Sequence, residues 1–155
     1  DLAAQKVATS PDLKTMSRDD WDPRPQKLMK DWGHDLVHSF TDFAEAHTVM
    51  TGASDALNNA PAILFVTIPK QTPDWAILDA GAFMQSLLLA ATAKGLGSIP
   101  TYNSVRYPQV VRQVLGIPET ERLLVGVELG YESSAKVNAF RAQRPDLSDV
   151  LKISE

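Results

Sequence analysis

Four consecutive residues, Pro100-Thr101-Tyr102-Asn103, directly follow a short apolar run and could hold a flat ring. Proline has a fixed φ and a rigid apolar surface, so Pro100 could form a wall against one face of such a ring. Backbone N–H groups just after it could donate hydrogen bonds to a polar ring edge. The same residues would also suit an ordinary turn after a buried strand, and their types alone leave both interpretations open.

Two arginines, Arg141 and Arg144, lie near the end of the chain in the segment NAFRAQRPDL. A guanidinium group is planar and makes paired, charge-assisted hydrogen bonds, which suits a phosphate group. The alternative interpretation is a pair of solvated surface arginines.

Other common kinds of site find little support in the sequence. The chain has no Cys, which excludes disulfides, thiolate nucleophiles and thiolate metal sites. His34 and His38 are four positions apart on an expected helix, but no third ligand accompanies them, so we expect no metal site. Gly95-Leu96-Gly97 lacks the third glycine of a dinucleotide-binding loop and ends a helix instead of opening one.

The longest apolar stretch, from Trp75 to Lys94, predicts a helix that ends at Gly95. It is apolar on nearly every face, which is typical of a helix buried on all sides or of a membrane span. Gln85, Ser86 and Thr92 interrupt the run, so we expect a core helix and no membrane partner. Gln85 is expected on a buried face, where it needs a hydrogen-bond partner.

The remaining segments predict an α+β (α/β-like) pattern in a single domain over residues 1–155. Ala60–Pro69 is rich in β-branched and aromatic residues, which predicts a central strand buried on both faces. The other expected elements are a loop-rich front over 1–25, a helix over about Gln26–Met50 that Gly33 could interrupt, a connection over 51–60, a strand over Ser98–Tyr102, an amphipathic helix over Tyr107–Leu115, a strand over Arg122–Tyr131 and a polar tail over 138–155.

Length and composition fit one globular domain. The chain has 155 residues, of which 44% are hydrophobic and 22% charged, as in ordinary soluble proteins. A net charge of −4 gives no electrostatic reason to expect a nucleic-acid partner. The first residues, DLAAQKVATSPDLK, lack the basic head and apolar core of a signal peptide, so we expect a cytoplasmic protein.

The segment Asp79–Gly97 resembles the flavin-dependent nitroreductase family. In that family a helix of the form D-x-G-x-x-x-Q-x-L-x-L-A-A-x-x-x-G-L-G leads into a short strand and a loop against the flavin, and every fixed letter occurs here. The resemblance extends over Asn59–Leu151. Its further marks are Tyr107-Pro108, Leu115-Gly116-Ile117-Pro118, Leu129-Gly130-Tyr131, Asn138-Ala-Phe-Arg141 and Arg144.

The resemblance implies an FMN-dependent oxidoreductase with a mixed sheet flanked by helices. Such an enzyme passes two electrons from NAD(P)H to a nitroaromatic, quinone or similar flat acceptor. The resemblance also implies an intertwined homodimer, in which the tail over 138–155 crosses to the partner and adds a strand to its sheet. It assigns no catalytic side chain. The flavin contacts that it carries over are Pro100, Thr101, Tyr102 and Asn103 for the ring and Arg141 and Arg144 for the phosphate.

Two departures from the family pattern limit what can be carried over. Many members have an acidic residue and then Gly where Tyr102 and Asn103 stand, so backbone contacts carry over there but side-chain roles do not. Members also begin with motifs like R-R-S-x-R and P-S-x-x-N-x-Q-P-W, and this chain resembles a member without that segment. An alternative expectation is therefore a non-catalytic or truncated chain of the same fold that binds flavin poorly. Trp32, Phe40 or Phe43 would line the substrate pocket by the same resemblance.

Overall fold

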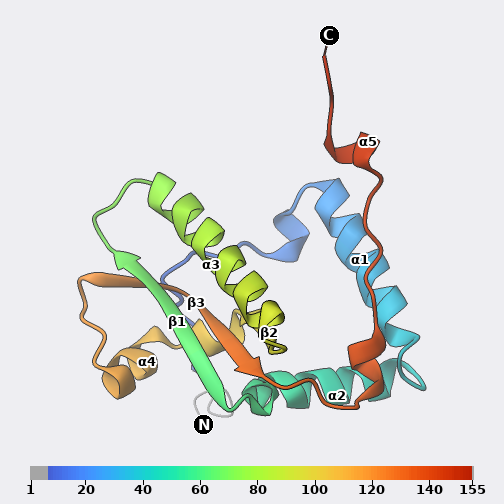
Figure 1. The fold of residues 1–155 in the computed structure, drawn as a ribbon, viewed down its shortest axis with the longest axis horizontal. Coiled ribbons are helices and arrows are strands. Elements are labelled where there is room, and N and C mark those ends of the chain that lie inside the picture. The colour runs from blue at the N-terminus through green and yellow to red at the C-terminus, as the bar shows by residue number, and fades with distance from the viewer. Residues whose placement is uncertain (1–6, 155) are drawn as a thin grey trace. The chain divides into compact units, whose positions relative to one another are not determined.

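The computed structural model describes residues 7–154, and the chain divides into two compact units. The sheet unit comprises residues 1–15 and 51–132, and the helix unit comprises residues 16–50 and 133–155. Figure 1 shows the course of the chain through both units. Each unit is described by itself.

The sheet unit is built on three antiparallel strands. They are β1 (Ala62–Pro69), β2 (Gly97–Thr101) and β3 (Glu121–Gly130), in the order β1-β3-β2. β3 pairs with both neighbours, with Val127 opposite Leu64 on one side and Pro100 on the other. The strands predicted over 98–102 and 122–131 are confirmed with ends shifted by one residue, and so is the α+β class.

The prediction that Ala60–Pro69 forms a central strand is wrong within this chain. β1 lies at an edge of the described sheet, and β3 is the central strand, with Leu123 and Val127 fully buried. β1 has one buried residue, Val66, while Leu64 is 42% exposed. An apolar run indicates that a strand is buried but not which neighbours cover it. The position of this strand in the sheet could therefore not be predicted from the run.

Helix α3 (Trp75–Ala93) confirms the predicted helix and its glycine stop. Gly95 has a φ of +73°, a left-handed conformation that glycine adopts without steric cost. The N–H of Gly95 bonds to the carbonyl of Thr92 at 2.9 Å, and the N–H of Leu96 bonds to that of Ala91 at 3.0 Å. This pair of bonds is a Schellman motif, which satisfies the last carbonyls of the helix.

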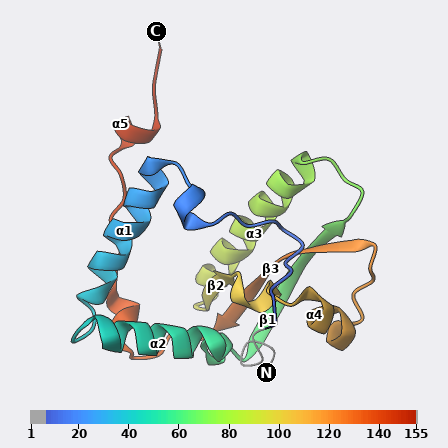
Figure 2. The same cartoon turned by 180° about the vertical axis from the view of Figure 1, so that it is seen from behind.

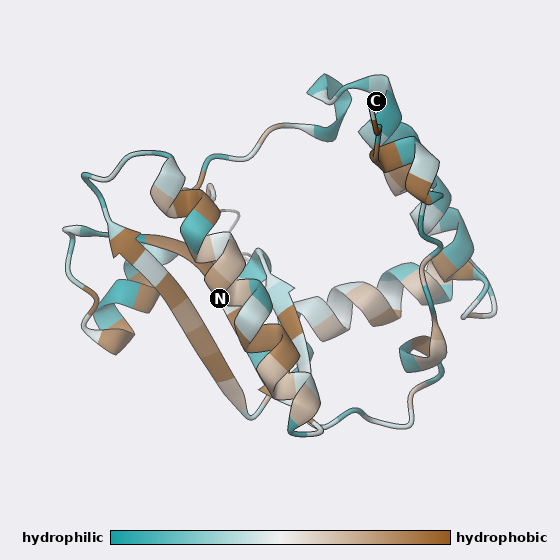
Figure 3. Ribbon diagram, turned by 45° about the horizontal axis from the view of Figure 1, so that its top comes forward, coloured by the Kyte–Doolittle hydropathy of each residue, from teal (hydrophilic) through white to brown (hydrophobic). Residues whose placement is uncertain are grey.

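The expectation that α3 is buried on all sides is wrong for the single chain. One face contacts β1 and β2, as Figure 1 shows, and Ala91 is the one buried residue of the helix. Trp75 and Leu89 are 72% and 62% exposed, and Gln85 is exposed as well. The reason is that one three-stranded sheet can cover only one face of a helix. Figure 3 shows the hydrophobic bands of α3 and β1 in brown.

By length and composition alone, α3 is the one helix among residues 7–154 that could cross a membrane. Such a helix is weak evidence for a membrane span, because core helices of soluble proteins have the same composition. In this chain, one side of the helix packs on the sheet of its own unit.

Shorter elements complete the sheet unit. Helix α4 (Pro108–Leu115) confirms the predicted amphipathic helix, with Pro108 in its first turn. The 3-10 turn η3 (Asn103–Val105) joins β2 to α4, and η2 (Leu57–Asn59) precedes β1. The segment from residue 7 to residue 15 lies beside α4 (Figure 2), because Tyr107 and Gln109 hold it by hydrogen bonds.

The single helix expected over about Gln26–Met50 is instead two helices. They are α1 (Pro23–Val37) and α2 (Phe43–Asp55), and the break falls after Val37, not at Gly33. The Asp42 carboxylate accepts a bond from the Glu45 N–H at 2.8 Å, and the Glu45 carboxylate accepts one from the Thr41 N–H at 2.6 Å. This reciprocal capping starts a new helix at residue 43.

The rest of the helix unit is short turns. They are η1 (Arg18–Asp20), which lies in the front expected to be loop-rich, and η4 (Lys136–Ala139) and α5 (Leu147–Val150) in the tail. The ring of Trp32 in α1 meets that of Phe140 edge to face, with centroids 6.2 Å apart. The tail therefore packs against α1 through this aromatic pair.

Candidate functional site

The predicted ring-binding residues lie where β2 ends. Pro100 and Thr101 are the last two residues of β2, opposite Val127 and Gly126 of β3. Tyr102 precedes η3 and Asn103 begins it. The central strand thus fixes the backbone of the first two residues, and the turn fixes that of the last two.

Hydrogen bonds make this corner a defined structure. The Asn103 side chain donates from Nδ2 to the carbonyl of Ser54 at 2.6 Å. The Ser104 hydroxyl donates to the carbonyl of Thr101 at 2.9 Å. The Asn103 N–H donates to the Thr101 hydroxyl at 3.2 Å, so one of the backbone donors expected for a ring edge already has a partner within the loop.

An apolar pocket of about 300 Å³ opens beside this corner. Pro100 and Tyr102 line it, together with residues of α3, β1, β3 and the N-terminal segment. The full lining is Pro11, Leu13, Thr15, Val66, Ile77, Ala80, Gly81, Met84, Pro100, Tyr102, Val105, Leu124 and Val125. Such a volume is at the lower end of the range for small-molecule sites, and the apolar lining suits the faces of a flat ring.

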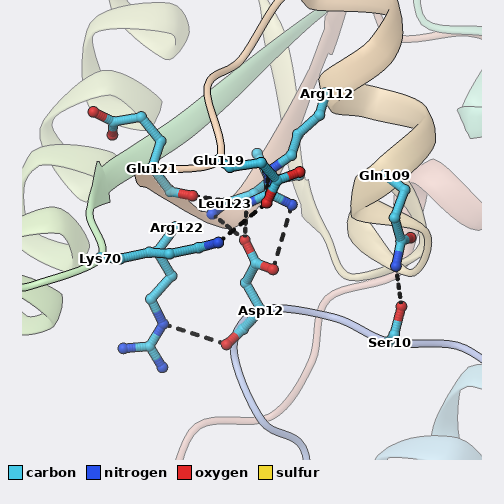
Figure 4. Close-up of polar contacts among 9 residues, drawn as sticks. All are labelled: Ser10, Asp12, Lys70, Gln109, Arg112, Glu119, Glu121, Arg122 and Leu123. Atoms are coloured by element: carbon cyan, nitrogen blue, oxygen red, sulfur yellow. Dashed lines mark hydrogen bonds and ion pairs between the residues drawn. The ribbon is translucent and has the colours of Figure 1, made fainter.

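One ion pair fixes the N-terminal segment that forms part of this pocket. Figure 4 shows Asp12 facing Arg112 of α4, whose Nη1 and Nη2 donate to its two carboxylate oxygens. The Leu123 N–H donates to the same carboxylate at 2.7 Å. Arg112 is 7% exposed and also donates to the Glu121 carbonyl at 2.7 Å.

The environment of this pair favours its charged form. Burial raises the pKa of the Asp12 carboxyl, but hydrogen bonds from Arg112 and Leu123 and the charge of Arg112 outweigh burial, so its pKa lies below the ordinary value. The hydrogen bond to Asp12 raises the pKa of Arg112 against the effect of burial. Neither residue could be identified from the sequence, because an Asp in a Pro-rich loop carries no signal of a partner a hundred positions away.

The two predicted phosphate-binding residues lie in the helix unit, apart from the loop residues in the sheet unit. Both Arg141 and Arg144 are exposed. Arg141 donates from Nη1 to the carbonyls of Asn138 at 2.7 Å and Phe140 at 3.0 Å. The structure brings together the four loop residues within the sheet unit, and the phosphate role of the two arginines stays a prediction.

The helix unit contains the aromatic residues and the histidine pair that the sequence singled out. Trp32 and Phe43 are 39% and 70% exposed. The rings of His34 and His38 meet edge to face, with centroids 4.9 Å apart. Among residues 7–154, no group of three or more His, Asp or Glu side chains is placed to hold a metal ion.

Comparison with known proteins agrees with the resemblance found in the sequence. Residues 6–131 match the model of the nitroreductase family, and the chain belongs to that family. A 4-nitrobenzoate reductase of Pseudomonas putida is 31% identical over 86 residues, which are 55% of this chain and 38% of that protein. Nitroreductase NfnB of Mycolicibacterium smegmatis is 35% identical over 96 residues, 61% of this chain and 41% of that protein.

Solved structures share the fold. The FMN-dependent nitroreductase NfnB from Mycobacterium smegmatis, solved in complex with NADPH, aligns with a TM-score of 0.86 at 26% identity, covering 99% of this chain and 70% of that one. The FMN- and NADPH-dependent NfnB of a Sphigopyxis strain aligns with a TM-score of 0.82 at 22% identity, covering 99% and 70%. The matches to the curated relatives span about two fifths of the length of those proteins.

Proposed function

We propose that this chain functions as an FMN-dependent oxidoreductase that passes two electrons from NAD(P)H to a nitroaromatic, quinone or similar flat acceptor in the cytoplasm. The observation that carries the proposal is the apolar pocket bounded by Pro100 and Tyr102, which lies where the family resemblance places the flavin loop. Relatives named as nitroreductases and as a 4-nitrobenzoate reductase support the same chemistry.

The residues present fit the ring of FMN better than its phosphate. Pro100 and Tyr102 would lie against the ring, and backbone N–H groups of residues 101–103 would bond its edge. Arg141 and Arg144 would hold the phosphate. When bound, FMN would supply two-electron chemistry between NAD(P)H and the acceptor, by which a nitro group would take two electrons from the donor and two protons from the donor and solvent, lose water and become a nitroso group. The chain needs only to bind and orient the two partners, which explains why no acid–base pair is required.

A homodimer is part of this proposal. The face of α3 that points away from the sheet carries Trp75, Leu78 and Leu89, all more than 60% exposed. A surface this apolar on one helix is typical of a protein contact. A second copy of the chain would cover this face. By the family resemblance, the tail of one subunit would also add a strand to the sheet of the other. β1, an edge strand among the described residues, offers free backbone groups for such pairing.

One observation favours the alternative, a chain of this fold that binds flavin poorly. The Asn103 N–H already donates to the Thr101 hydroxyl, so this donor is available to a ring edge only if that bond breaks. In this alternative the chain keeps the fold and the subunit contact through α3 but transfers no electrons.

Absorption spectroscopy separates the two functions. The purified chain, mixed with equimolar FMN and passed through a desalting column, is expected to keep a flavin band that bleaches on addition of NAD(P)H and returns on addition of 4-nitrobenzoate. A chain that elutes colourless, with FMN recovered in the small-molecule fraction, would overturn the enzyme proposal and support the alternative.

A further inference from the structure

Glu128 is a buried carboxylate that the proposed electron transfer does not use. It lies on the central strand β3, opposite Ile63 of β1 and Ile99 of β2, and is 2% exposed. Its Oε2 accepts a hydrogen bond from Asn58 Nδ2 at 2.7 Å, and among residues 7–154 nothing donates to its Oε1. Because a buried carboxylate with a single partner would lose most of its compensation without that partner, the bond from Asn58 is a firm attachment.

Asn58 belongs to a turn with a strained backbone. Leu57, Asn58 and Asn59 of η2 have φ values of +49°, +51° and +51°. Asparagine tolerates this left-handed conformation better than most residues, but leucine does not. Such a run persists only where surrounding contacts hold it. Within the turn the Asn59 N–H donates to the Ala56 carbonyl at 3.0 Å, and the Asn58 side chain attaches the turn to Glu128 of the sheet.

The same stretch of chain is bonded to the expected flavin loop, residues 100–103. The carbonyl of Ser54, in the last turn of α2, accepts the bond from Asn103 Nδ2 at 2.6 Å. Ser54 and Asn58 are four positions apart, and the path between them is the end of α2 and the start of η2. A displacement of Asn58 would therefore displace Ser54, and with it the attachment of Asn103.

The position of Asn103 bears directly on flavin binding. Its backbone N–H is one of the donors expected for a ring edge, and it donates to the Thr101 hydroxyl at 3.2 Å. Thr101 is fixed in β2 and by the Ser104 hydroxyl, whereas the Asn103 side chain is attached to Ser54, outside the loop. The direction of the Asn103 N–H thus depends on where η2 and the end of α2 are held.

We propose that Glu128 and Asn58 are positioning residues of the flavin loop, which hold η2 in its left-handed conformation so that Ser54 holds Asn103. The ligand of that loop rests on the proposed function, whereas the link from Glu128 to Asn103 is a property of the chain alone. The proposal gives a reason for a carboxylate at a site that an apolar side chain would occupy with less loss of hydration.

Selective ¹⁵N-asparagine labelling tests the link without flavin. The chain has four asparagines, Asn58, Asn59, Asn103 and Asn138, and the last lies in the tail. Glu128→Leu removes the acceptor but fills its buried place with an apolar side chain, so the chain is expected to stay folded. The variant is expected to shift the side-chain and backbone amide signals of Asn103 as well as those of Asn58, and to leave those of Asn138 unmoved. A folded Glu128→Leu chain with unmoved Asn103 signals would overturn the positioning role.

The affinity for FMN tests what the link does. Glu128→Leu is expected to raise the Kd for FMN at least about tenfold, because a loop that is no longer held must be ordered on binding. Glu128→Gln keeps an oxygen that accepts from Asn58, so its Kd should stay within about threefold of that of the unaltered chain. Glu132→Leu makes the same change at an exposed glutamate just after β3 and should alter the Kd less than about twofold.

Two results of this titration would contradict the proposal. One is a folded Glu128→Leu chain that binds FMN as tightly as the unaltered chain does. The other is a Glu128→Gln chain that binds FMN as weakly as Glu128→Leu, because the retained oxygen would then support nothing.

A second variant keeps the test open if Glu128→Leu does not fold. Asn58→Gly removes the same hydrogen bond and relieves the turn, since glycine adopts a φ of +51° without steric cost. It is expected to shift the Asn103 signals and to raise the Kd for FMN as Glu128→Leu would. Asn59→Gly is the matched control, because it relieves the next left-handed position and leaves the bond to Glu128 intact. A folded Asn58→Gly chain with the Asn103 signals of the unaltered chain would refute the link.

Failure of this inference differs from failure of the proposed function. If the Asn103 signals move as expected but the unaltered chain retains no FMN, the positioning of Asn103 holds and the oxidoreductase does not. If the unaltered chain binds FMN and reduces nitroaromatics, but Glu128→Leu changes neither the Asn103 signals nor the Kd, the oxidoreductase stands and Glu128 has no part in it.

Discussion

Gly126 of β3 and Ser104 of η3 approach so closely that a Cβ at position 126 would lie 2.1 Å from the Ser104 hydroxyl oxygen. Thr101, the strand partner of Gly126, accepts the hydrogen bond of that same hydroxyl. The turn after Pro100 is thus held against the central strand, and a side chain at position 126 would push it away. Glycine is required here for space, not for an unusual φ.

Gly126→Ala is therefore expected to destabilise the chain by about 2 kcal/mol, because the new methyl group overlaps Ser104 and approaches Phe65 to 3.2 Å. Urea unfolding followed by circular dichroism measures the change. Gly52→Ala in helix α2 is the matched control, since a Cβ there meets nothing within 4 Å, and it should stabilise by up to about 1 kcal/mol. Ser104→Gly should restore part of the loss in the Gly126→Ala background. Equal effects of the two alanines would contradict the steric explanation.

The sequence predicted most elements of the sheet unit, because their signals are local. Gly95 ends α3, Pro108 opens α4, and the β-branched run before Pro69 forms a strand. The predictions that were wrong concern which neighbouring elements cover a strand or helix. The edge position of β1 and the exposure of Gln85 depend on neighbours that a local pattern does not contain.

The candidate site was predicted in part for the same reason. Pro100 and Tyr102 were found because they follow a recognisable glycine stop, and they do line a pocket. Asp12 and Arg112 were missed because an ion pair between residues 100 positions apart has no periodicity to reveal it. Only the folded path of the chain brings the N-terminal segment to α4.

The ion pair between Asp12 and Arg112 should make stability depend on pH. The folded state lowers the pKa of Asp12, so its contribution is complete above the ordinary aspartate value and is lost as the pH falls through the lower folded value. Asp12→Asn should cost about 2 kcal/mol at pH 7, and this difference should shrink as the pH falls below about 4.

Urea unfolding of both chains at pH 7 and at pH 3 measures this difference. Asp20→Asn, an exposed aspartate of η1, is the control and should change the unfolding free energy at pH 7 by less than about 0.5 kcal/mol. A penalty for Asp12→Asn that is the same at both pH values would show that the carboxylate charge does not contribute.

Replacing both arginines of the tail tests the predicted phosphate contact. Arg141→Ala with Arg144→Ala is expected to raise the Kd for FMN at least about tenfold, since each lost guanidinium–phosphate bond is a charge-assisted one. Quenching of FMN fluorescence on titration with the chain measures the affinity. Lys152→Ala removes another exposed cation of the tail. It should change the Kd for FMN less than about twofold, because salt screens the interaction of a distant charge with the phosphate. If the double variant binds FMN as the unaltered chain does, these arginines are solvated surface residues.

The uncovered face of α3 gives the sharpest test of the homodimer. Leu78 and Leu89 are eleven positions apart, about three helical turns, so they lie on the same face, and both are more than 60% exposed. Leu78→Glu with Leu89→Glu would place two carboxylates in an apolar contact and is expected to weaken dimerisation by about a hundredfold or more. Val114→Glu alters an even more exposed apolar residue on α4 and should leave assembly unchanged. Sedimentation velocity across a range of concentrations should show dimers for the unaltered and Val114→Glu chains and monomers for the double variant. A double variant that still sediments as a dimer would place the subunit contact away from this face of α3.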